Sequence, residues 1–142
     1  MFITLETDYA VRITSVLCEK GVKTDAKSIS EEAAVTLRFT LKILRKLVGA
    51  GLVKSFKGTR GGYIIDMDPK DITLRMVIEA IEGPYYFSRC LAPECECSQG
   101  SANECSCRKA FGEVSDLVRN KLDEYNFYDL INADKKDKEA VQ

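Results

Sequence analysis

The feature that most constrains the fold is a stretch of 33 residues, 33–65, that contains no Asp or Glu. It carries a local charge of +7, although the whole chain has a net charge of −1. Charge concentrated in one segment is typical of a surface that binds phosphate; a solvated basic surface is the other interpretation. The cations of the stretch are Arg38, Lys42, Arg45, Lys46, Lys54, Lys57 and Arg60.

The first half of this stretch predicts a helix over 37–50 with Thr36 as its N-cap. Arg38, Lys42 and Arg45 follow each other at helical spacing and form a narrow cationic ridge. The apolar residues of the helix cover a broad opposite arc, so we expect them to pack inward. They are Leu37, Leu41, Ile43, Leu44, Leu47 and Val48, and Thr40 lies nearer to this apolar side.

The elements around this helix have clear sequence signals. Apolar spacing predicts a helix over 8–20 that ends at Gly21, and a short helix over 26–34 with Thr24 or Asp25 as its cap. Two strand-like runs, 52–56 and 63–65, flank the glycine-rich segment 57–62, which predicts a hairpin. A further helix is predicted over 73–82, with Thr73 as its cap.

This order of elements predicts a winged helix-turn-helix in residues 1–83, mainly α with a small β-hairpin wing. An α-helix fits the major groove, so we expect helix 37–50 and the wing to contact double-stranded DNA at a promoter operator. A winged helix used only for protein contacts is the rival, which the acid-free stretch disfavours. The candidate DNA contacts are Arg38, Thr40, Lys42, Arg45, Lys46, Lys57 and Arg60.

Residues 84–107 are predicted to form an irregular loop, and five of the six cysteines lie inside it, in a stretch of 18 residues. Crowded thiols predict a metal site, because cysteine thiolates bind zinc and iron–sulfur clusters. The spacing is not the paired C-x2-C of a zinc ribbon. Four interpretations of the cysteines remain: an iron–sulfur cluster, a less regular zinc site, thiol redox sensing, or free thiols with a structural disulfide. The five are Cys90, Cys95, Cys97, Cys105 and Cys107, whereas Cys18 lies in an apolar helical pattern and is predicted to be in the core.

The C-terminal part begins with a predicted amphipathic helix over about 108–125. It follows the complete domain, so residues 108–132 are predicted to pair two copies in a homodimer, with packing inside one chain as the alternative. The charged tail, 133–142, is expected to be flexible. No run of about 18 apolar residues and no signal peptide are present, so we expect a cytoplasmic protein without membrane contact.

The sequence disfavours an enzyme. It contains no His that could act as a base, no C-x-x-C beside a βαβ pattern, and no nucleotide-binding loop.

Several short segments together resemble the iron–sulfur-type winged-helix regulators, the family that includes IscR, NsrR and RirA. The resemblance covers about residues 1–132. It rests on residues 7–12, 29–31, 44–47, 51–53, 57–63, 72–74, 77–78, 82–83, 122–123 and 128–130.

The resemblance implies a homodimeric transcription factor, usually a repressor, whose DNA binding depends on an iron–sulfur cluster, [2Fe–2S] or [4Fe–4S]. The three family cysteines match Cys90, Cys97 and Cys105, with Cys95 as the alternative middle ligand. Cys95, Cys107 or Asp8 are possible further ligands, the last by likeness to the nitric-oxide-sensing branch.

Two departures from the family pattern are visible. The His ligand of the IscR branch corresponds to Arg108, and a Glu on its recognition helix corresponds to Leu41. Some members lack the cysteines and respond through partner proteins. Sensing through zinc, thiol oxidation or a protein partner is therefore the alternative function.

Overall fold

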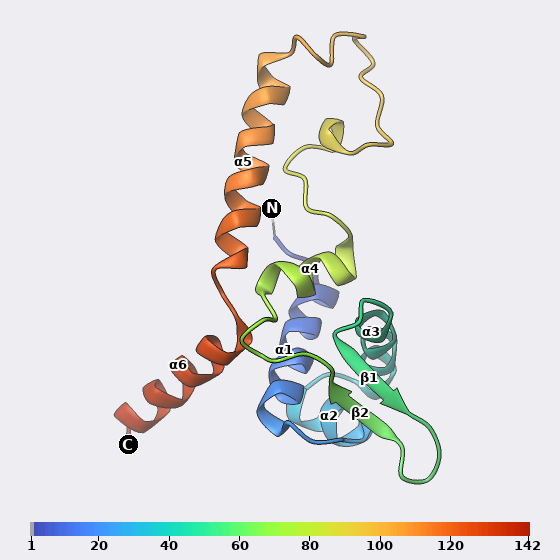
Figure 1. The fold of residues 1–142 in the computed structure, drawn as a ribbon, viewed down its shortest axis with the longest axis vertical. Coiled ribbons are helices and arrows are strands. Elements are labelled where there is room, and N and C mark those ends of the chain that lie inside the picture. Colours follow the sequence, from blue (N-terminus) through green and yellow to red (C-terminus); the bar gives the residue numbers. More distant parts are fainter. Residues whose placement is uncertain (1) are drawn as a thin grey trace.

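Helix α1 (Leu5–Lys20) runs through the centre of the N-terminal lobe, and α2, α3, α4, α6 and strand β2 all pack against it (Figure 1). The computed structural model describes residues 2–142. The Thr4 side chain caps α1, so the helix begins three residues earlier than the predicted start. Gly21 ends α1 in the left-handed conformation, as the sequence predicts.

Helices α2 (Ala26–Ala33) and α3 (Leu37–Gly49) form the helix-turn-helix. Asp25 caps the first and Thr36 caps the second, each by accepting a backbone N–H in the first turn. Between them, Ala34 adopts a left-handed conformation with φ of 53°, and its N–H and that of Val35 close the turn. The predicted short helix, tight turn and capped third helix are therefore confirmed.

Strands β1 (Val53–Phe56) and β2 (Gly62–Ile65) form the antiparallel wing, with Val53 opposite Ile65. Thr24 joins the outer side of β2 through two backbone hydrogen bonds to Tyr63. Gly62 lies so close to this connection that a Cβ atom would be 2.8 Å from the Thr24 carbonyl oxygen. Glycine at this position lets the segment before α2 pair with the wing.

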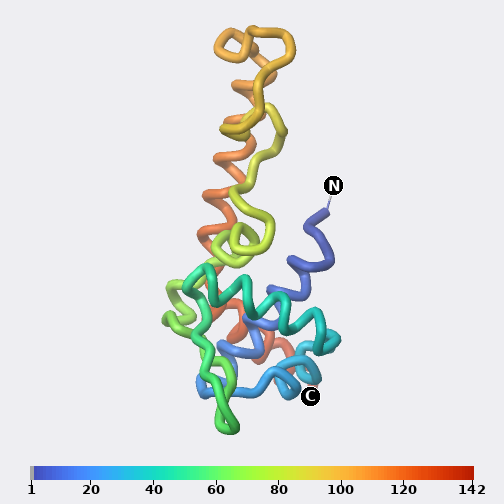
Figure 2. The backbone as a smooth tube through the Cα atoms, turned by 90° about the vertical axis from the view of Figure 1, so that its right-hand side faces the viewer, coloured from blue at the N-terminus to red at the C-terminus, as the bar shows by residue number. Residues whose placement is uncertain are grey.

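Helix α4 (Leu74–Glu82) completes the lobe, and Thr73 caps it as predicted. The chain then forms a long loop with one 3-10 turn, η1 (Arg89–Leu91), before helix α5 (Ser106–Asp123). Figures 1 and 2 show this loop at the far end of α5, opposite the wing. The fold class is therefore the predicted one, a winged helix-turn-helix with a C-terminal helix.

The last helix, α6 (Phe127–Ala140), returns to the N-terminal lobe. Phe127 is fully buried and Ile131 is buried, both in the core that α1 organises. The Phe127 N–H donates to the Ile72 carbonyl oxygen, and the Leu74 N–H donates to that of Tyr125. The start of α6 therefore packs inside the chain, the alternative that the sequence left open, and the tail continues as an exposed helix to Ala140.

The burial of Phe127 gives a direct test of this packing. We expect Phe127→Ala to lower the free energy of unfolding by about 3–5 kcal/mol, because it leaves a cavity where α6 meets the core. The neighbouring Tyr128 is exposed, with its ring under the Lys70 ammonium, so Tyr128→Ala should cost about 1 kcal/mol or less. Urea unfolding at one protein concentration measures both. Equal losses would contradict the anchoring role of Phe127.

Candidate DNA-binding surface and cysteine loop

The outward side of α3 carries the predicted cationic ridge. Arg38, Lys42 and Arg45 are all exposed on it. Within residues 2–142, neither Arg38 nor Arg45 has a carboxylate within 4.0 Å. Lys42 and Lys46 instead contact Glu6 of α1, with Nζ–O distances of 3.3 Å and 2.7 Å. This side of α3 therefore carries two guanidinium groups without an ion pair in the described residues. It also carries two ammonium groups, those of Lys42 and Lys46, that share one carboxylate.

The apolar arc of α3 is narrower than the sequence predicts. Ile43, Leu44 and Leu47 are fully buried, but Leu37 and Leu41 are 44% and 42% exposed. The buried arc is centred on Thr40, Ile43, Leu44 and Leu47, which places Leu37 and Leu41 at its edge. The prediction that these two leucines pack inward is therefore wrong. Leu41 lies beside the cationic ridge.

Thr40 differs from the other candidate DNA contacts because it has no exposed surface. Its hydroxyl is buried without a hydrogen-bond partner among the described residues. A side chain in this position cannot reach a duplex, so the structure removes Thr40 from the contact surface. The sequence had already placed it near the apolar side of the helix.

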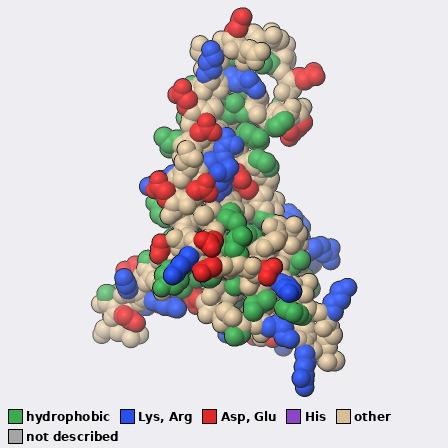
Figure 3. All heavy atoms as spheres, in the orientation of Figure 1, with side chains coloured by type: hydrophobic (Ala, Val, Ile, Leu, Met, Phe, Trp, Pro, Cys, Tyr) green, Lys and Arg blue, Asp and Glu red, His purple; other side chains and the backbone are tan. Residues whose placement is uncertain are grey.

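The wing carries cations away from the lobe. Lys57 and Arg60 are exposed at the hairpin tip. Figure 3 shows Lys and Arg side chains projecting at the lower right, where Figure 1 places this hairpin. Lys23 also belongs to this surface, with its ammonium 5.3 Å from the centre of the Phe56 ring. Lys23 is not among the predicted contacts because it lies outside the acid-free stretch, and only the pairing of Thr24 with β2 brings it to the wing.

The cysteine loop forms a pocket of about 570 Å³ at the far end of the molecule. Four of the five loop cysteines line it, together with polar residues of the same loop. Cys107 does not line the pocket and is exposed in the first turn of α5. All six cysteines are free thiols. The lining cysteines are Cys90, Cys95, Cys97 and Cys105.

The thiols of the chain differ in acidity. The N–H groups of Gln99, Ser101 and Gly100, in that order, and the charge of Arg108 lower the pKa of Cys97. A lowered pKa favours the thiolate, which is the form that binds metals. Burial raises the pKa of Cys18 to about 12, and the charge of Glu19 adds to this effect. Cys18 packs against the core of the lobe, as predicted, and stays protonated.

The pocket gathers thiols, but the residues that the structure describes do not form a preformed site for a metal ion in it. Among residues 2–142, no group of three or more Cys, Asp or Glu side chains is arranged to hold one metal ion. A cluster distributes its thiolate ligands over several irons, so its ligands surround a space and do not converge on one point. Four free cysteines line the pocket, and the thiolate is the chemical type of ligand that such a cluster requires.

Arg108 holds the two ends of the loop together. Its Nε–H donates to the Cys90 carbonyl oxygen at 3.1 Å, and its Nη1 lies 3.5 Å from the Ala102 carbonyl oxygen. Its backbone N–H approaches Cys105 Sγ, the N-cap of α5, at 3.5 Å. The sequence identified Arg108 only as the position of a missing His; the structure shows a side chain that ties the loop to α5.

The base of the loop is fixed to both neighbouring helices. The Phe87 N–H donates to the hydroxyl of the buried Ser115, and the Phe87 ring packs against Phe111 of α5. The Tyr85 N–H donates to Glu79 of α4. The loop therefore begins at a rigid junction of α4 and α5.

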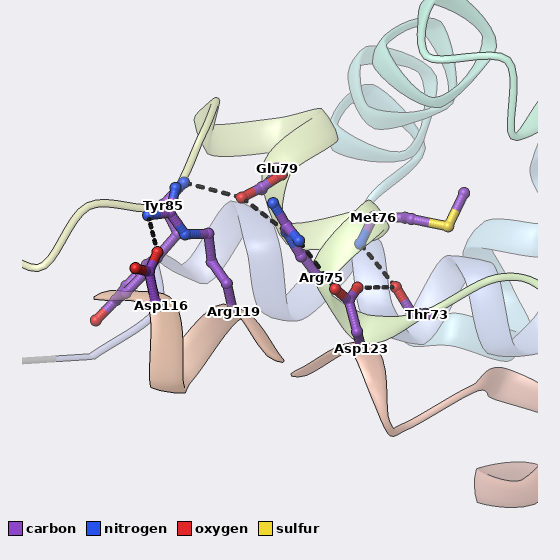
Figure 4. Close-up of polar contacts among 8 residues, drawn as sticks. All are labelled: Thr73, Arg75, Met76, Glu79, Tyr85, Asp116, Arg119 and Asp123. Carbon is purple, nitrogen blue, oxygen red and sulfur yellow. Dashed lines mark hydrogen bonds and ion pairs between the residues drawn. The ribbon is translucent and has the colours of Figure 1, made fainter. Parts of the chain in front are cut away.

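An ion-pair network joins the same two helices below this junction (Figure 4). Arg75 of α4 pairs with Glu79 at 3.2 Å and with Asp123 of α5 at 2.9 Å. The Thr73 hydroxyl also donates to Asp123. Glu79 therefore contacts both the base of the loop and Arg75.

An apolar groove lies beside the junction. Its walls come from the irregular segment before α1, from α4, from the start of the cysteine loop and from α5, and its volume is about 240 Å³. Further along α5, Val114 is partly exposed and Leu117 is 68% exposed. Asp8, the candidate ligand on α1, pairs with Arg12 at 2.7 Å and does not line the cysteine pocket of its own chain. The groove is lined by Phe2, Ile3, Ile78, Glu82, Tyr85, Val118 and Leu122.

No helix within residues 2–142 has the length and apolar character needed to span a membrane.

Comparisons with known proteins agree with the architecture. The model of the Rrf2 family, described as iron-dependent transcriptional regulators, matches residues 3–133. The HTH-type transcriptional regulator CymR of Bacillus subtilis is 28% identical over 142 residues, covering 99% of this chain and 96% of its own.

Two solved structures extend the likeness to three dimensions. The structure of CymR, the global cysteine regulator of B. subtilis, has a TM-score of 0.72 and 27% identity, covering 94% of this chain and 98% of its own. The structure of T. potens IscR has the same TM-score at 24% identity, covering 100% of this chain and 91% of its own. The second likeness is one of fold.

The tether made by Arg108 can be tested by proteolysis. Arg108→Ala removes the contacts to Cys90 and Ala102, so we expect Glu-specific protease to cut the loop about fivefold faster, which corresponds to a loss of about 1 kcal/mol. The loop offers Glu94, Glu96 and Glu104 as cleavage sites. The exposed neighbour Lys109 provides the control, since Lys109→Ala should leave the rate unchanged. Equal cleavage of both variants would refute the tether.

Proposed function

Because the chain belongs to the Rrf2 family of iron-dependent transcriptional regulators, we propose that it is a cytoplasmic homodimeric repressor whose operator affinity depends on an iron–sulfur cluster in the cysteine loop. In this proposal, residues 1–83 bind DNA, residues 84–107 hold the cluster, α5 pairs the two copies, and α6 packs against the DNA-binding lobe without contacting DNA. The observation that carries it is the position of four cysteines around one pocket. This pocket lies at the end of the molecule opposite the proposed DNA-binding lobe.

The DNA-binding half follows from the arrangement of cations. Arg38 and Arg45 project from α3 without an ion pair in the described residues, which leaves them available for phosphates or base edges. Lys57 and Arg60 extend the surface along the wing, and Lys23 adds to it. Lys42 and Lys46 can bind DNA phosphates only when their ion pairs with Glu6 are broken.

Cys90, Cys97 and Cys105 are the proposed cluster ligands, with Cys95 as the fourth. All four line the same pocket, whereas Cys107 lies outside it. A bound cluster supplies iron–thiolate bonds that respond to oxidants and to iron supply. Asp8 stays a candidate only as a ligand from the partner copy, because in its own chain it pairs with Arg12.

The chain's own contacts provide the coupling. Arg108 ties the loop to α5, and the Tyr85–Glu79 hydrogen bond ties its base to α4. A loop held in one shape fixes the angle between the lobe and α5. In a homodimer paired through the exposed side of α5, that angle sets the distance between two recognition helices. Operator binding depends on that distance, and a coupling of about 1–3 kcal/mol is enough for a useful switch.

A regulator that senses through its thiols is the second candidate. The likeness to CymR, described as the global cysteine regulator of B. subtilis, favours it. The exposed thiol of Cys107, outside the pocket, would be available for oxidation. Zinc in the pocket or a protein partner are further forms of this cluster-free alternative.

Absorption of protein purified without oxygen separates these functions. We expect a visible charge-transfer band with matching iron and sulfide, since cluster-bound iron absorbs there and zinc does not. Cys90→Ser, Cys97→Ser and Cys105→Ser should each lose the band, while Cys107→Ser should keep it. Protein that stays colourless after anaerobic reconstitution would end the cluster proposal and leave the DNA-binding proposal in place.

DNA binding has its own test, with fluorescence anisotropy on labelled duplexes over a range of salt concentrations. Arg38→Ala should raise Kd, and Lys57→Ala should reduce the slope of log K against log salt by about one unit, because one phosphate contact is lost. Lys135→Ala, on the exposed part of α6, is the matched control and should change neither. Normal binding by both test variants would remove α3 and the wing from the interface.

A further inference from the structure

Glu6 occupies an unusual place, between the first turn of α1 and the cationic side of α3. Its Oε1 atom is shielded from solvent and lies 2.7 Å from Lys46 Nζ. Its Oε2 atom lies 3.3 Å from Lys42 Nζ. One carboxylate therefore faces two ammonium groups of the helix that the proposed function places in the major groove. This is the geometry by which a DNA phosphate would also approach the two lysines.

The carboxylate is charged throughout the neutral range. The close ion pair with Lys46 is the largest cause of a lowered pKa at Glu6; burial opposes it, and the hydrogen bond from Lys42 adds to the lowering. The Glu6 side chain is 23% exposed, so solvent screens its pairs less than it screens pairs on the open surface. A phosphate that approaches Lys42 or Lys46 must displace a carboxylate that is already present.

The turn that carries Glu6 is held in place from the other side. The Thr4 N–H and hydroxyl both donate to Oε1 of Glu82, at 3.0 Å and 2.8 Å, and the Thr7 hydroxyl donates to the same atom. Burial alone would raise the pKa of Glu82, but the hydrogen bonds from Thr7 and Thr4 lower it, so this acceptor is charged as well. Glu82 ends α4, directly before the cysteine loop. The backbone turn that presents Glu6 to the lysines is therefore anchored to the end of α4.

We propose that Glu6 is a built-in competitor of DNA phosphate, which holds Lys42 and Lys46 in internal ion pairs and thereby limits the affinity of the recognition helix for DNA. This inference rests on the proposed DNA-binding function and names a regulating residue within it. Arg38 and Arg45 on the same ridge have no such competitor among the described residues, so they carry most of the phosphate attraction of α3.

The first test uses a labelled duplex of mixed sequence, about three helical turns long, because sequence-independent binding measures the phosphate contribution. Glu6→Gln should tighten binding by about three- to tenfold near physiological salt and should steepen the salt slope by about one to two units, as one or two cations become available. Glu139→Gln, at the exposed end of α6, makes the same change in net charge far from α3 and should change neither value. Equal salt slopes for Glu6→Gln and the parent chain would overturn the inference.

A second comparison begins with single variants that leave Glu6 in place, so its first part does not depend on the folding of Glu6→Gln. Lys42→Ala should reduce the salt slope by less than about half a unit, because Lys42 is already neutralised, whereas Arg45→Ala should reduce it by about one unit. In the Glu6→Gln background, Lys42→Ala should cost a full unit. A Lys42→Ala effect that is equal to that of Arg45→Ala, and the same in both backgrounds, would refute competition.

These outcomes separate the inference from the function on which it rests. A parent chain that does not bind duplex DNA at any salt concentration would remove the DNA-binding proposal together with the role of Glu6. A parent chain that binds with a steep salt dependence, but is indifferent to Glu6→Gln, would keep the DNA-binding proposal and overturn only the competition.

Discussion

The packing of α1 at the centre of the N-terminal lobe is the interaction on which the rest of the structure depends. Its inner face places Ala10, Ile13 and Leu17 in the core, and it contacts both helices of the helix-turn-helix, α4, α6 and the wing. Each of these elements is too short to be stable alone, so its position is set by the apolar surface that it buries on α1. The first turn of α1 then extends this role to charge, because Glu6 contacts α3 while Thr4 and Thr7 contact Glu82.

The charge distribution explains how a chain with a net charge of −1 can present a phosphate-binding surface. Acidic residues are absent from α3 and the wing, but one carboxylate from α1 is brought to the edge of that surface. Sequence distance alone gave no sign of this contact, because Glu6 and Lys42 are separated by 36 positions. The charge of this surface therefore depends both on the local composition of α3 and the wing and on one ion-pair cluster formed with α1. Such partly shielded pairs influence binding more than exposed ones do.

The cysteine loop and the recognition helix lie far apart, so any influence of one on the other must pass through the helices between them. The loop base is fixed to α4 by Glu79 and to α5 by Ser115, and Arg75 joins these helices below. The contacts are short-range and directional, and they involve charged or buried groups. Displacement of the loop base would break them together, which makes a two-state response more natural than a gradual one.

The sequence by itself determined the elements from α1 to α5 and their order, because caps, glycines and apolar periodicity are local signals. Thr36 and Thr73 cap the predicted helices, and Gly21 ends α1. It also identified the crowded cysteines and the cationic ridge. The tertiary structure alone decided how wide the buried side of α3 is, so that Thr40 is enclosed while Leu37 and Leu41 are exposed. It also decided that Phe127 returns to the core, that Arg108 closes the cysteine loop, and that Glu6 faces two lysines. These outcomes depend on contacts between residues distant in sequence, and burial and pairing are properties of the assembled fold that a local pattern does not contain.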